Sequence, residues 1–92
     1  ELIDRVQQAA ANEVKYIILN PGGFTHTSVA LRDALLAVKI PFTEIHLSNT
    51  FAREEFRKNS YFSGIAENCL FGFGAYGYEL ALRSACQSIG ID

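Results

Sequence analysis

The stretch from Tyr16 to Ser28, YIILNPGGFTHTS, constrains the fold of this chain more than any other. It begins with a short continuous apolar run, Tyr16 to Leu19, which is typical of a strand covered on both faces of a sheet. The run ends at Asn20 to Gly23, because proline gives no donor to a strand ladder and glycine frees the backbone. Polar residues then lead into an apolar helical pattern. The stretch therefore predicts a strand, a loop and a helix in succession.

Apolar residues at helical spacing predict three amphipathic helices. They cover Glu1 to about Ala11, Val29 to about Val38, and Tyr76 to about Gln87. The second helix ends before Pro41, because the residue before a proline disfavours helical geometry. A shorter helix is expected from Ala52 to about Phe56.

Three segments have the pattern of strands: Val14 to Leu19, Phe42 to Leu47, and Asn68 to Phe73. Helices and strands therefore alternate along the chain, which predicts an α/β fold with a parallel sheet and right-handed crossovers. The first helix has no strand before it. We therefore expect one or more further strands upstream of Glu1, and an N-terminally incomplete sheet.

The composition limits the classes of function. The 92 residues suffice for a single small domain, and the net charge of −2 gives no reason to expect a nucleic acid or an acidic membrane as partner. No apolar run reaches the roughly 18 residues of a membrane span. Cys69 and Cys86 lack the spacing of metal ligands or of a redox pair, so we expect buried, reduced thiols in a cytosolic protein.

The strongest candidate for chemistry is a histidine beside a carboxylate. Glu44 and His46 are two residues apart in the alternating second strand, which places both on one face. Imidazole exchanges a proton near neutral pH, and a neighbouring carboxylate can hold its tautomer and raise its basicity. The pair is either a general acid oriented by its carboxylate or a hydrogen-bonded polar pair at a strand end.

Other polar residues follow the strands, where ligands bind in open α/β sheets. Asn20 and His26 could bind hydroxyl groups, or could simply end a strand and occupy a loop. Backbone N–H groups near Ser48 could receive a carboxylate or phosphate, or form an ordinary turn. Arg53 and Arg57 could recognise an anion or belong to a solvated surface. A third ligand to complete a metal site with the two histidines is not evident.

The segment GFGAYG places Gly72, Gly74 and Gly77 at the predicted turn between the last strand and the last helix. This spacing matches a dinucleotide-binding fingerprint only loosely, and no acidic ribose partner follows it. Close packing of the last helix on the sheet is the favoured interpretation.

Four motifs, in this order and spacing, resemble the type II 3-dehydroquinate dehydratases of the shikimate pathway: NPGGFTHTSVALRDAL, EIHLSN, AREEFR and GFGAYGYELAL. The resemblance extends over the whole chain. It implies a flavodoxin-like fold, with a five-stranded parallel sheet between helices, and a homo-oligomeric dodecamer built of trimers. It also implies a cytoplasmic enzyme of aromatic amino-acid biosynthesis. Such an enzyme removes water from 3-dehydroquinate by anti elimination through an enolate, giving 3-dehydroshikimate without metal or cofactor.

The resemblance also implies roles for individual residues. His46 corresponds to the general acid that protonates the leaving hydroxyl, and Glu44 to the residue that orients it. Asn20, His26 and Arg57 correspond to residues that bind substrate hydroxyls. The backbone of Leu47 and Ser48, with the Ser48 side chain, corresponds to the site of the substrate carboxylate. Asp33 matches a position that reaches a neighbouring subunit's site, and Arg53 matches an arginine near the lid.

The chain departs from the family pattern in two places. Gly22, Gly23 and Phe24 stand where the family usually has two alanines and a tyrosine. The family's first two strands, with the lid that carries the catalytic arginine and the tyrosine base, precede the point where this chain begins. We therefore expect the acid half of the site here, and little turnover from the isolated chain. The alternatives are a non-catalytic flavodoxin-like module that binds a phosphate or nucleotide, and a purely structural subunit.

Overall fold

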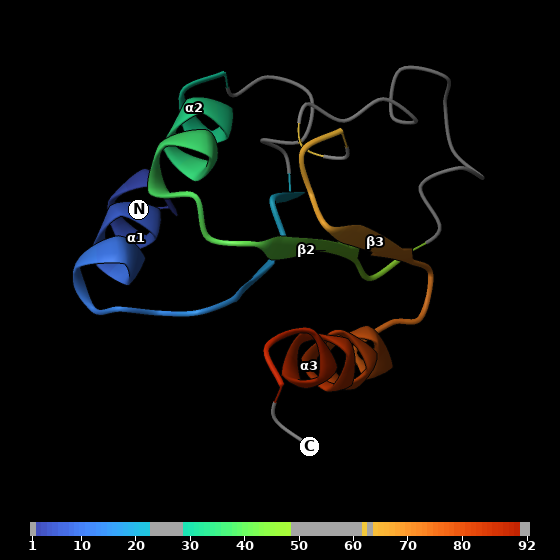
Figure 1. The fold of residues 1–92 in the computed structure, drawn as a ribbon. Coiled ribbons are helices and arrows are strands. Elements are labelled where there is room, and N and C mark those ends of the chain that lie inside the picture. Colours follow the sequence, from blue (N-terminus) through green and yellow to red (C-terminus); the bar gives the residue numbers. More distant parts are fainter. Residues whose placement is uncertain (1, 23–28, 49–61, 63, 91–92) are drawn as a thin grey trace.

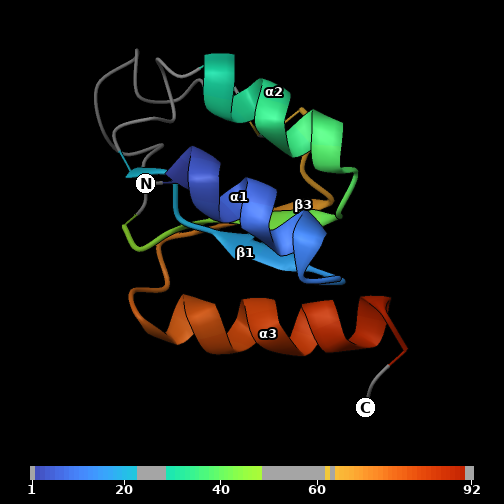
Figure 2. The ribbon, with the colours of Figure 1, turned by 90° about the vertical axis from the view of Figure 1, so that its left-hand side faces the viewer.

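The computed structural model describes residues 2–22, 29–48, 62 and 64–90. The described elements follow one another along the chain as α1 (Leu2–Ala11), β1 (Ile17–Leu19), α2 (Val29–Val38), β2 (Phe42–His46), β3 (Asn68–Phe71) and α3 (Tyr76–Ser88). Figure 1 shows the strands between α3 on one side and α1 with α2 on the other. Figure 2 shows the same three layers after a quarter turn. The predicted α/β fold with helices on both faces of the sheet is confirmed.

The three described strands form one parallel sheet in the order β1-β2-β3. Leu19 of β1 lies opposite Glu44 of β2, and β3 continues the register with Cys69 opposite Glu44 and Phe71 opposite His46. All three strands run the same way, so their carboxyl ends meet at one edge of the sheet. That edge is where the sequence places its polar residues.

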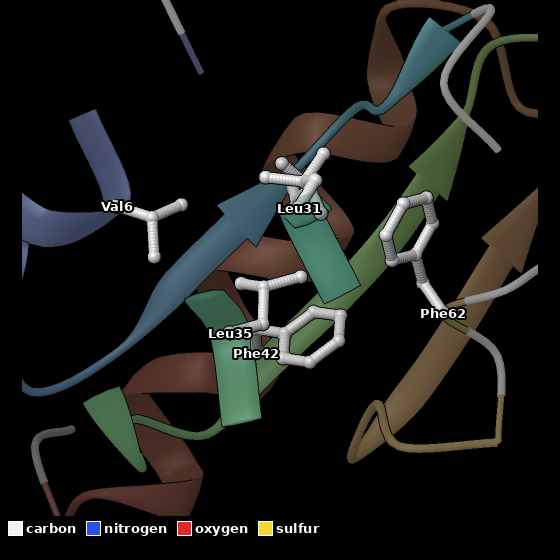
Figure 3. Packing of buried hydrophobic residues seen from close by; sticks show 6 residues of the cluster. Val6, Leu31, Leu35, Phe42 and Phe62 are labelled. Atoms are coloured by element: carbon white, nitrogen blue, oxygen red, sulfur yellow. The ribbon is translucent and has the colours of Figure 1, made fainter. Parts of the chain in front are cut away.

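The main core lies between the sheet and the two helices α1 and α2 (Figure 3). Its buried members are Val6, Leu19, Leu31, Leu35, Phe42 and Phe62. The helix α2 begins and ends as predicted from its apolar stripe, because Leu31 and Leu35 are buried four residues apart while Asp33 is exposed. None of the described helices is long and apolar enough to cross a membrane.

The other face of the sheet is covered by α3, which approaches it closely at Gly77. A Cβ atom at Gly77 would lie 3.0 Å from Cδ1 of Ile45 in β2. Only a residue without a side chain allows this approach without a shift of its neighbour. The structure thus confirms the interpretation of Gly77 as a packing residue.

The predicted strands are shorter in the structure. β1 begins at Ile17 and not at Val14, because Glu13 takes the left-handed conformation at φ 60° and strand pairing begins only at Ile17. β2 ends one residue early, at His46. β3 ends at Phe71 and not at Phe73, because Gly72 turns the chain with φ 87°.

The expectation of a strand covered on both faces was wrong for Ile17 and Ile18, which are only half-buried. In the described sheet β1 pairs with β2 and stands at the edge, where fewer neighbours cover its side chains. The predicted short helix from Ala52 to Phe56 lies outside the described residues.

Candidate functional site

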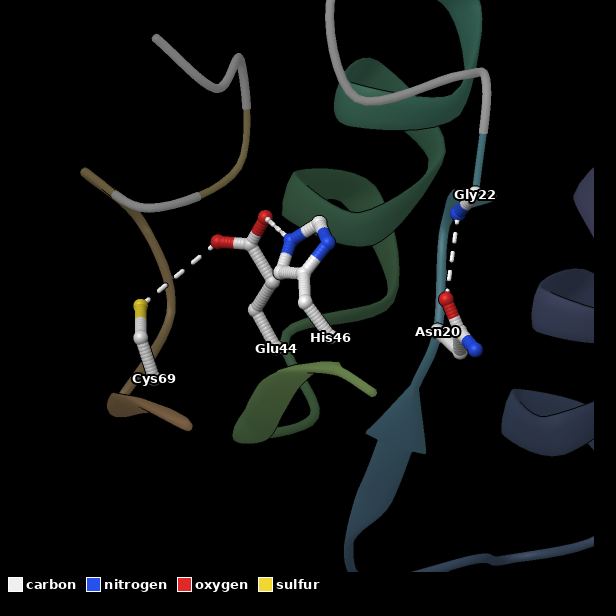
Figure 4. A network of polar contacts seen from close by, with 5 residues as sticks. All are labelled: Asn20, Gly22, Glu44, His46 and Cys69. Carbon is white, nitrogen blue, oxygen red and sulfur yellow. Dashed lines mark hydrogen bonds and ion pairs between the residues drawn. The ribbon is translucent and has the colours of Figure 1, made fainter. Parts of the chain in front are cut away.

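Glu44 and His46 lie together at the carboxyl end of β2, on the face that carries α2 (Figure 4). Phe42, two residues earlier on the same face, belongs to the core beneath α2. The Nε2 atom of His46 lies 2.6 Å from Oε2 of Glu44. The Glu44 side chain has no exposed surface and that of His46 is 9% exposed. The structure thus confirms the prediction that these two side chains lie side by side on one face of the strand.

The contact fixes how the imidazole can carry protons. An ionised carboxylate only accepts hydrogen bonds, so Nε2 of His46 must donate to Glu44. A charge-assisted bond of this length is among the stronger hydrogen bonds in proteins. The second ring nitrogen, Nδ1, is then the atom through which His46 can give or take a proton. Such an arrangement suits a general acid or base.

The neighbouring strand β3 contributes two residues that the sequence analysis did not assign to the site. The thiol of Cys69 donates to Oε1 of Glu44 at 3.5 Å (Figure 4). The ring of Phe71 stacks on the imidazole of His46, with ring centroids 4.9 Å apart and planes 2° from parallel. The only sequence signal is the matching two-residue spacing of Cys69 and Phe71, and it becomes informative once the strand register is known.

The expectation of buried thiols was wrong. Cys69 and Cys86 are both thiols outside any disulfide, but each is only half-buried. Cys69 lies on β3, at the other edge of the described sheet from β1, and Cys86 lies on α3.

Asn20 directly follows β1, and both ends of its side-chain amide have partners. Its Oδ1 accepts from the backbone N–H of Gly22 at 3.2 Å, which shapes the loop after the strand. Its Nδ2 donates to the hydroxyl of Tyr78 in α3 at 3.2 Å. An amide has two donor hydrogens and two acceptor lone pairs. Asn20 therefore keeps one of each for a ligand. The contact with Tyr78 was not foreseen from the sequence.

Leu47 and Ser48 follow β2, and both are exposed. The carbonyl of Leu47 accepts from the N–H of Gly74 at 2.7 Å, and that of His46 accepts from Gly72 at 3.1 Å. The two bonds hold the segment after β2 against the turn after β3. The backbone that was predicted to receive a carboxylate is therefore fixed in place.

Of the four other predicted site residues, one lies on α2 and three lie outside the described residues. Asp33 is exposed on α2. His26, Arg53 and Arg57 lie outside the described residues. Within the described ranges there is no group of three or more histidine, cysteine, aspartate or glutamate side chains that could hold a metal ion.

Comparison with known proteins relates the chain to one group of enzymes. The family described as dehydroquinase class II matches residues 1–86. The chain is 63% identical over 89 residues to the 3-dehydroquinate dehydratase of Polynucleobacter necessarius subsp. necessarius (strain STIR1), covering 97% of this chain and 60% of that protein. It is 65% identical over 85 residues to the enzyme of the same name from Polynucleobacter asymbioticus, covering 92% of this chain and 57% of that protein.

Solved structures give the same result. The type II dehydroquinase from Butyrivibrio crossotus DSM 2876 superposes with a TM-score of 0.88 at 40% identity, over 91% of this chain and 59% of that one. The type II dehydroquinase from Propionibacterium acnes superposes with a TM-score of 0.86 at 36% identity, over 94% of this chain and 62% of that one. The chain thus spans about 60% of the length of the relatives it matches. With nearly the whole chain matched in sequence and in fold, it belongs to the class II dehydroquinase family.

Proposed function

We propose that this chain is the part of a 3-dehydroquinate dehydratase that supplies the acid half of the active site. The reaction is the anti elimination of water from 3-dehydroquinate to give 3-dehydroshikimate, a step of the shikimate pathway of aromatic amino-acid biosynthesis. The observation that carries the proposal is the buried contact of 2.6 Å between Nε2 of His46 and Oε2 of Glu44, at the carboxyl end of β2. The names of the relatives supply the substrate.

In this proposal His46 is the general acid and Glu44 its positioning residue. A base outside the described residues removes a proton next to the substrate carbonyl, and the electron pair moves onto the carbonyl oxygen as an enolate. The enolate then reforms the carbonyl while the carbon–oxygen bond of the leaving hydroxyl breaks. His46 gives that oxygen the proton carried by Nδ1, so the group leaves as water. The negative charge of Glu44 balances the imidazolium before the transfer.

The substrate-binding residues are proposals that rest on placement. Asn20 keeps one amide hydrogen and one lone pair for a substrate hydroxyl, in addition to its contacts with Gly22 and Tyr78. Leu47 and Ser48 follow His46 directly and are proposed to hold the substrate carboxylate with their backbone N–H groups. The family resemblance alone supports the remaining assignments: His26 and Arg57 at the hydroxyls, Arg53 near the lid, and Asp33 toward a neighbouring subunit.

Further properties of the whole protein are proposed on the same basis. Residues 1–92 would be part of one dehydroquinase domain, which assembles as a homo-oligomeric dodecamer of trimers. The reaction would proceed without metal or cofactor. A cytoplasmic location would agree with the two cysteines, which are not joined in a disulfide.

The test is turnover and binding of 3-dehydroquinate by material that contains this chain, with its intact mass taken on the same sample. Turnover is expected when the base segment is present. Binding without turnover is expected from the 92-residue chain alone. Well-folded material that neither turns over nor binds 3-dehydroquinate, but binds a nucleotide or flavin saturably, would overturn the proposal in favour of a non-catalytic ligand-binding module.

A further inference from the structure

The register between β2 and β3 places one neighbour beside each member of the Glu44–His46 pair. Cys69 lies opposite Glu44 and Phe71 opposite His46. Side chains two residues apart share a face of a strand, so all four side chains point to the α2 face. β3 thus lies beside the pair and places a thiol next to the carboxylate and an aromatic ring next to the imidazole.

Phe71 restricts the orientation of the imidazole plane. The two rings are parallel to within 2°, with centroids 4.9 Å apart. Rotation of the His46 ring about its bond to Cβ would break this stack and move Nε2 away from Glu44. Stacking and the hydrogen bond therefore select the same ring orientation, in which Nδ1 has one fixed direction.

Cys69 restricts the carboxylate. Oε2 of Glu44 accepts from His46, and Oε1 accepts from the thiol of Cys69 at 3.5 Å. Donors on both oxygens define the plane of the carboxylate, and this plane sets the direction of the bond to Nε2. Thiols are weak donors, so this contribution is smaller than that of the stack.

We propose that Phe71 and Cys69 are positioning residues for the general acid, acting through the His46 ring and the Glu44 carboxylate. Neither needs to touch the substrate. The role deepens the proposed function and rests on it, because a held imidazole matters for the rate only if His46 transfers a proton. It predicts an effect on the catalytic step with little effect on substrate binding.

Four substitutions in the complete protein test the proposal. Phe71→Leu should lower kcat by about three- to tenfold, the range expected for loss of a ring stack, with KM changed by less than about twofold. Phe71→Tyr keeps the ring and should restore kcat to within about twofold of the parent protein. Cys69→Ala should lower kcat by about two- to fivefold, whereas Cys69→Ser retains a donor and should not.

Leu70→Ala is the matched control, because Leu70 lies between the two residues and points to the opposite face of β3. It removes a half-buried side chain from the same strand without touching the pair. We expect lower stability with kcat within about twofold of the parent protein. An equal loss of kcat in Leu70→Ala and Phe71→Leu would overturn the positioning role.

A second readout does not depend on activity. The Phe71 ring should shift the NMR signals of the His46 ring protons upfield, and Phe71→Leu should abolish that shift while Leu70→Ala preserves it. Unchanged His46 signals in Phe71→Leu, or a rise in KM with unchanged kcat, would contradict the proposal. If Phe71→Leu does not fold, the kcat values of Cys69→Ala and Cys69→Ser test the positioning role instead, and equal values in the two variants would contradict it. A parent protein that does not turn over 3-dehydroquinate would instead overturn the proposed function, while the ring shift would still show whether Phe71 holds the imidazole.

Discussion

Two polar clusters occupy opposite ends and opposite faces of the same small sheet. The acid cluster, defined as Glu44, His46, Cys69 and Phe71, lies at the carboxyl ends of the strands on the α2 face. The strand-start cluster, defined as Tyr16, Thr43, Glu67, Asn68 and Ser84, lies at the amino ends on the α3 face. Both meet at β2, where Thr43 and Glu44 are adjacent residues with no exposed surface.

The strand-start cluster connects all three strands to α3 through side-chain hydrogen bonds. The hydroxyls of Tyr16 and Thr43 are 2.8 Å apart, and Tyr16 also donates to Glu67 at 2.9 Å. Thr43 donates to Oδ1 of Asn68 at 2.5 Å, and Nδ2 of Asn68 donates to Ser84 at 3.3 Å. Its one buried residue is Thr43, whose side chain is a neutral hydroxyl, and its one carboxylate, Glu67, is exposed.

The difference between the clusters lies in which group is buried. A buried hydroxyl needs only one or two hydrogen-bond partners, so Thr43 can link neighbouring strands with little free-energy cost of burial. A buried carboxylate is costly unless it is paired, and the partner of Glu44 is the His46 imidazole, a group that can hold or release a proton. Among the described residues no buried side-chain polar atom lacks a hydrogen-bond partner. The presence of hydrogen-bond partners therefore does not distinguish the two clusters. They differ in that only the acid cluster holds a group that can transfer a proton.

The largest effect is expected when the proposed general acid, His46, is removed. His46→Ala in the complete protein should lower kcat by about 100- to 10,000-fold, the usual contribution of a general acid, with a much smaller change in KM. Steady-state kinetics with 3-dehydroquinate measure it. His46→Gln is the companion variant, because its amide still donates to Glu44 but cannot release a proton. A rate near that of the parent protein in either variant would refute the acid assignment.

A smaller loss of rate is expected from Glu44→Gln. This substitution keeps the shape and an acceptor but removes the charge, and hydrogen bonds to charged groups contribute about 1.5–3 kcal/mol. If that energy is expressed in the transition state, kcat falls about ten- to 100-fold. The same kinetic assay measures this effect. A kcat equal to that of the parent protein would show that the charge of Glu44 does not assist His46.

The strand-start cluster should behave in the opposite way. Thr43→Val removes one hydroxyl that contacts both Tyr16 and Asn68, so we expect the free energy of unfolding to fall by about 1–3 kcal/mol. Catalysis at the other end of the sheet should change by less than about twofold. Urea unfolding and kinetics on the same preparation measure both effects. A large loss of kcat without loss of stability would mean that the two clusters are coupled.

The smallest expected effect is a pH dependence of stability. Burial raises the pKa of Tyr16 above its usual value of 10.0, the hydrogen bond with Thr43 lowers it and Glu67 raises it. The folded state therefore favours the neutral phenol. The associated stability is complete below about pH 10 and is lost as the pH rises through the folded pKa.

Urea unfolding at several alkaline pH values should show a steeper decline for the parent protein than for Tyr16→Phe. The comparison with Tyr16→Phe is needed because the chain contains 4 tyrosines. Parallel declines in the two proteins would contradict the raised pKa of Tyr16.

Local patterns predicted most of the fold. The apolar stripe of α2 and the proline that follows it are local signals, and the predicted bounds agree with the structure. The start of β1 was missed because Val14 and Tyr16 suit a strand, although the left-handed turn at Glu13 delays pairing until Ile17. The end of β3 was missed because the backbone conformation of Gly72 is not specified by its neighbours.

The candidate site was predictable where it lies on one strand. Glu44 and His46 share a face by simple alternation, so their contact could be expected from spacing. Cys69 and Phe71 could not be assigned to the site, because their positions depend on the register between β2 and β3. Tyr78 reaches Asn20 from a helix that packs on the sheet, a contact between residues 58 apart in the chain. Such long-range contacts depend on tertiary packing, which a single sequence does not specify.

The most direct measurement of the central claim is the tautomer of His46, read from its ring ¹⁵N chemical shifts in the complete protein. The His46 signals are the ones that disappear in His46→Gln, because that variant removes only this ring. If the buried carboxylate of Glu44 holds the ring, the neutral imidazole carries its proton on Nε2 and leaves Nδ1 for the substrate. This preference should weaken in Glu44→Gln. A neutral His46 protonated on Nδ1 would contradict the account.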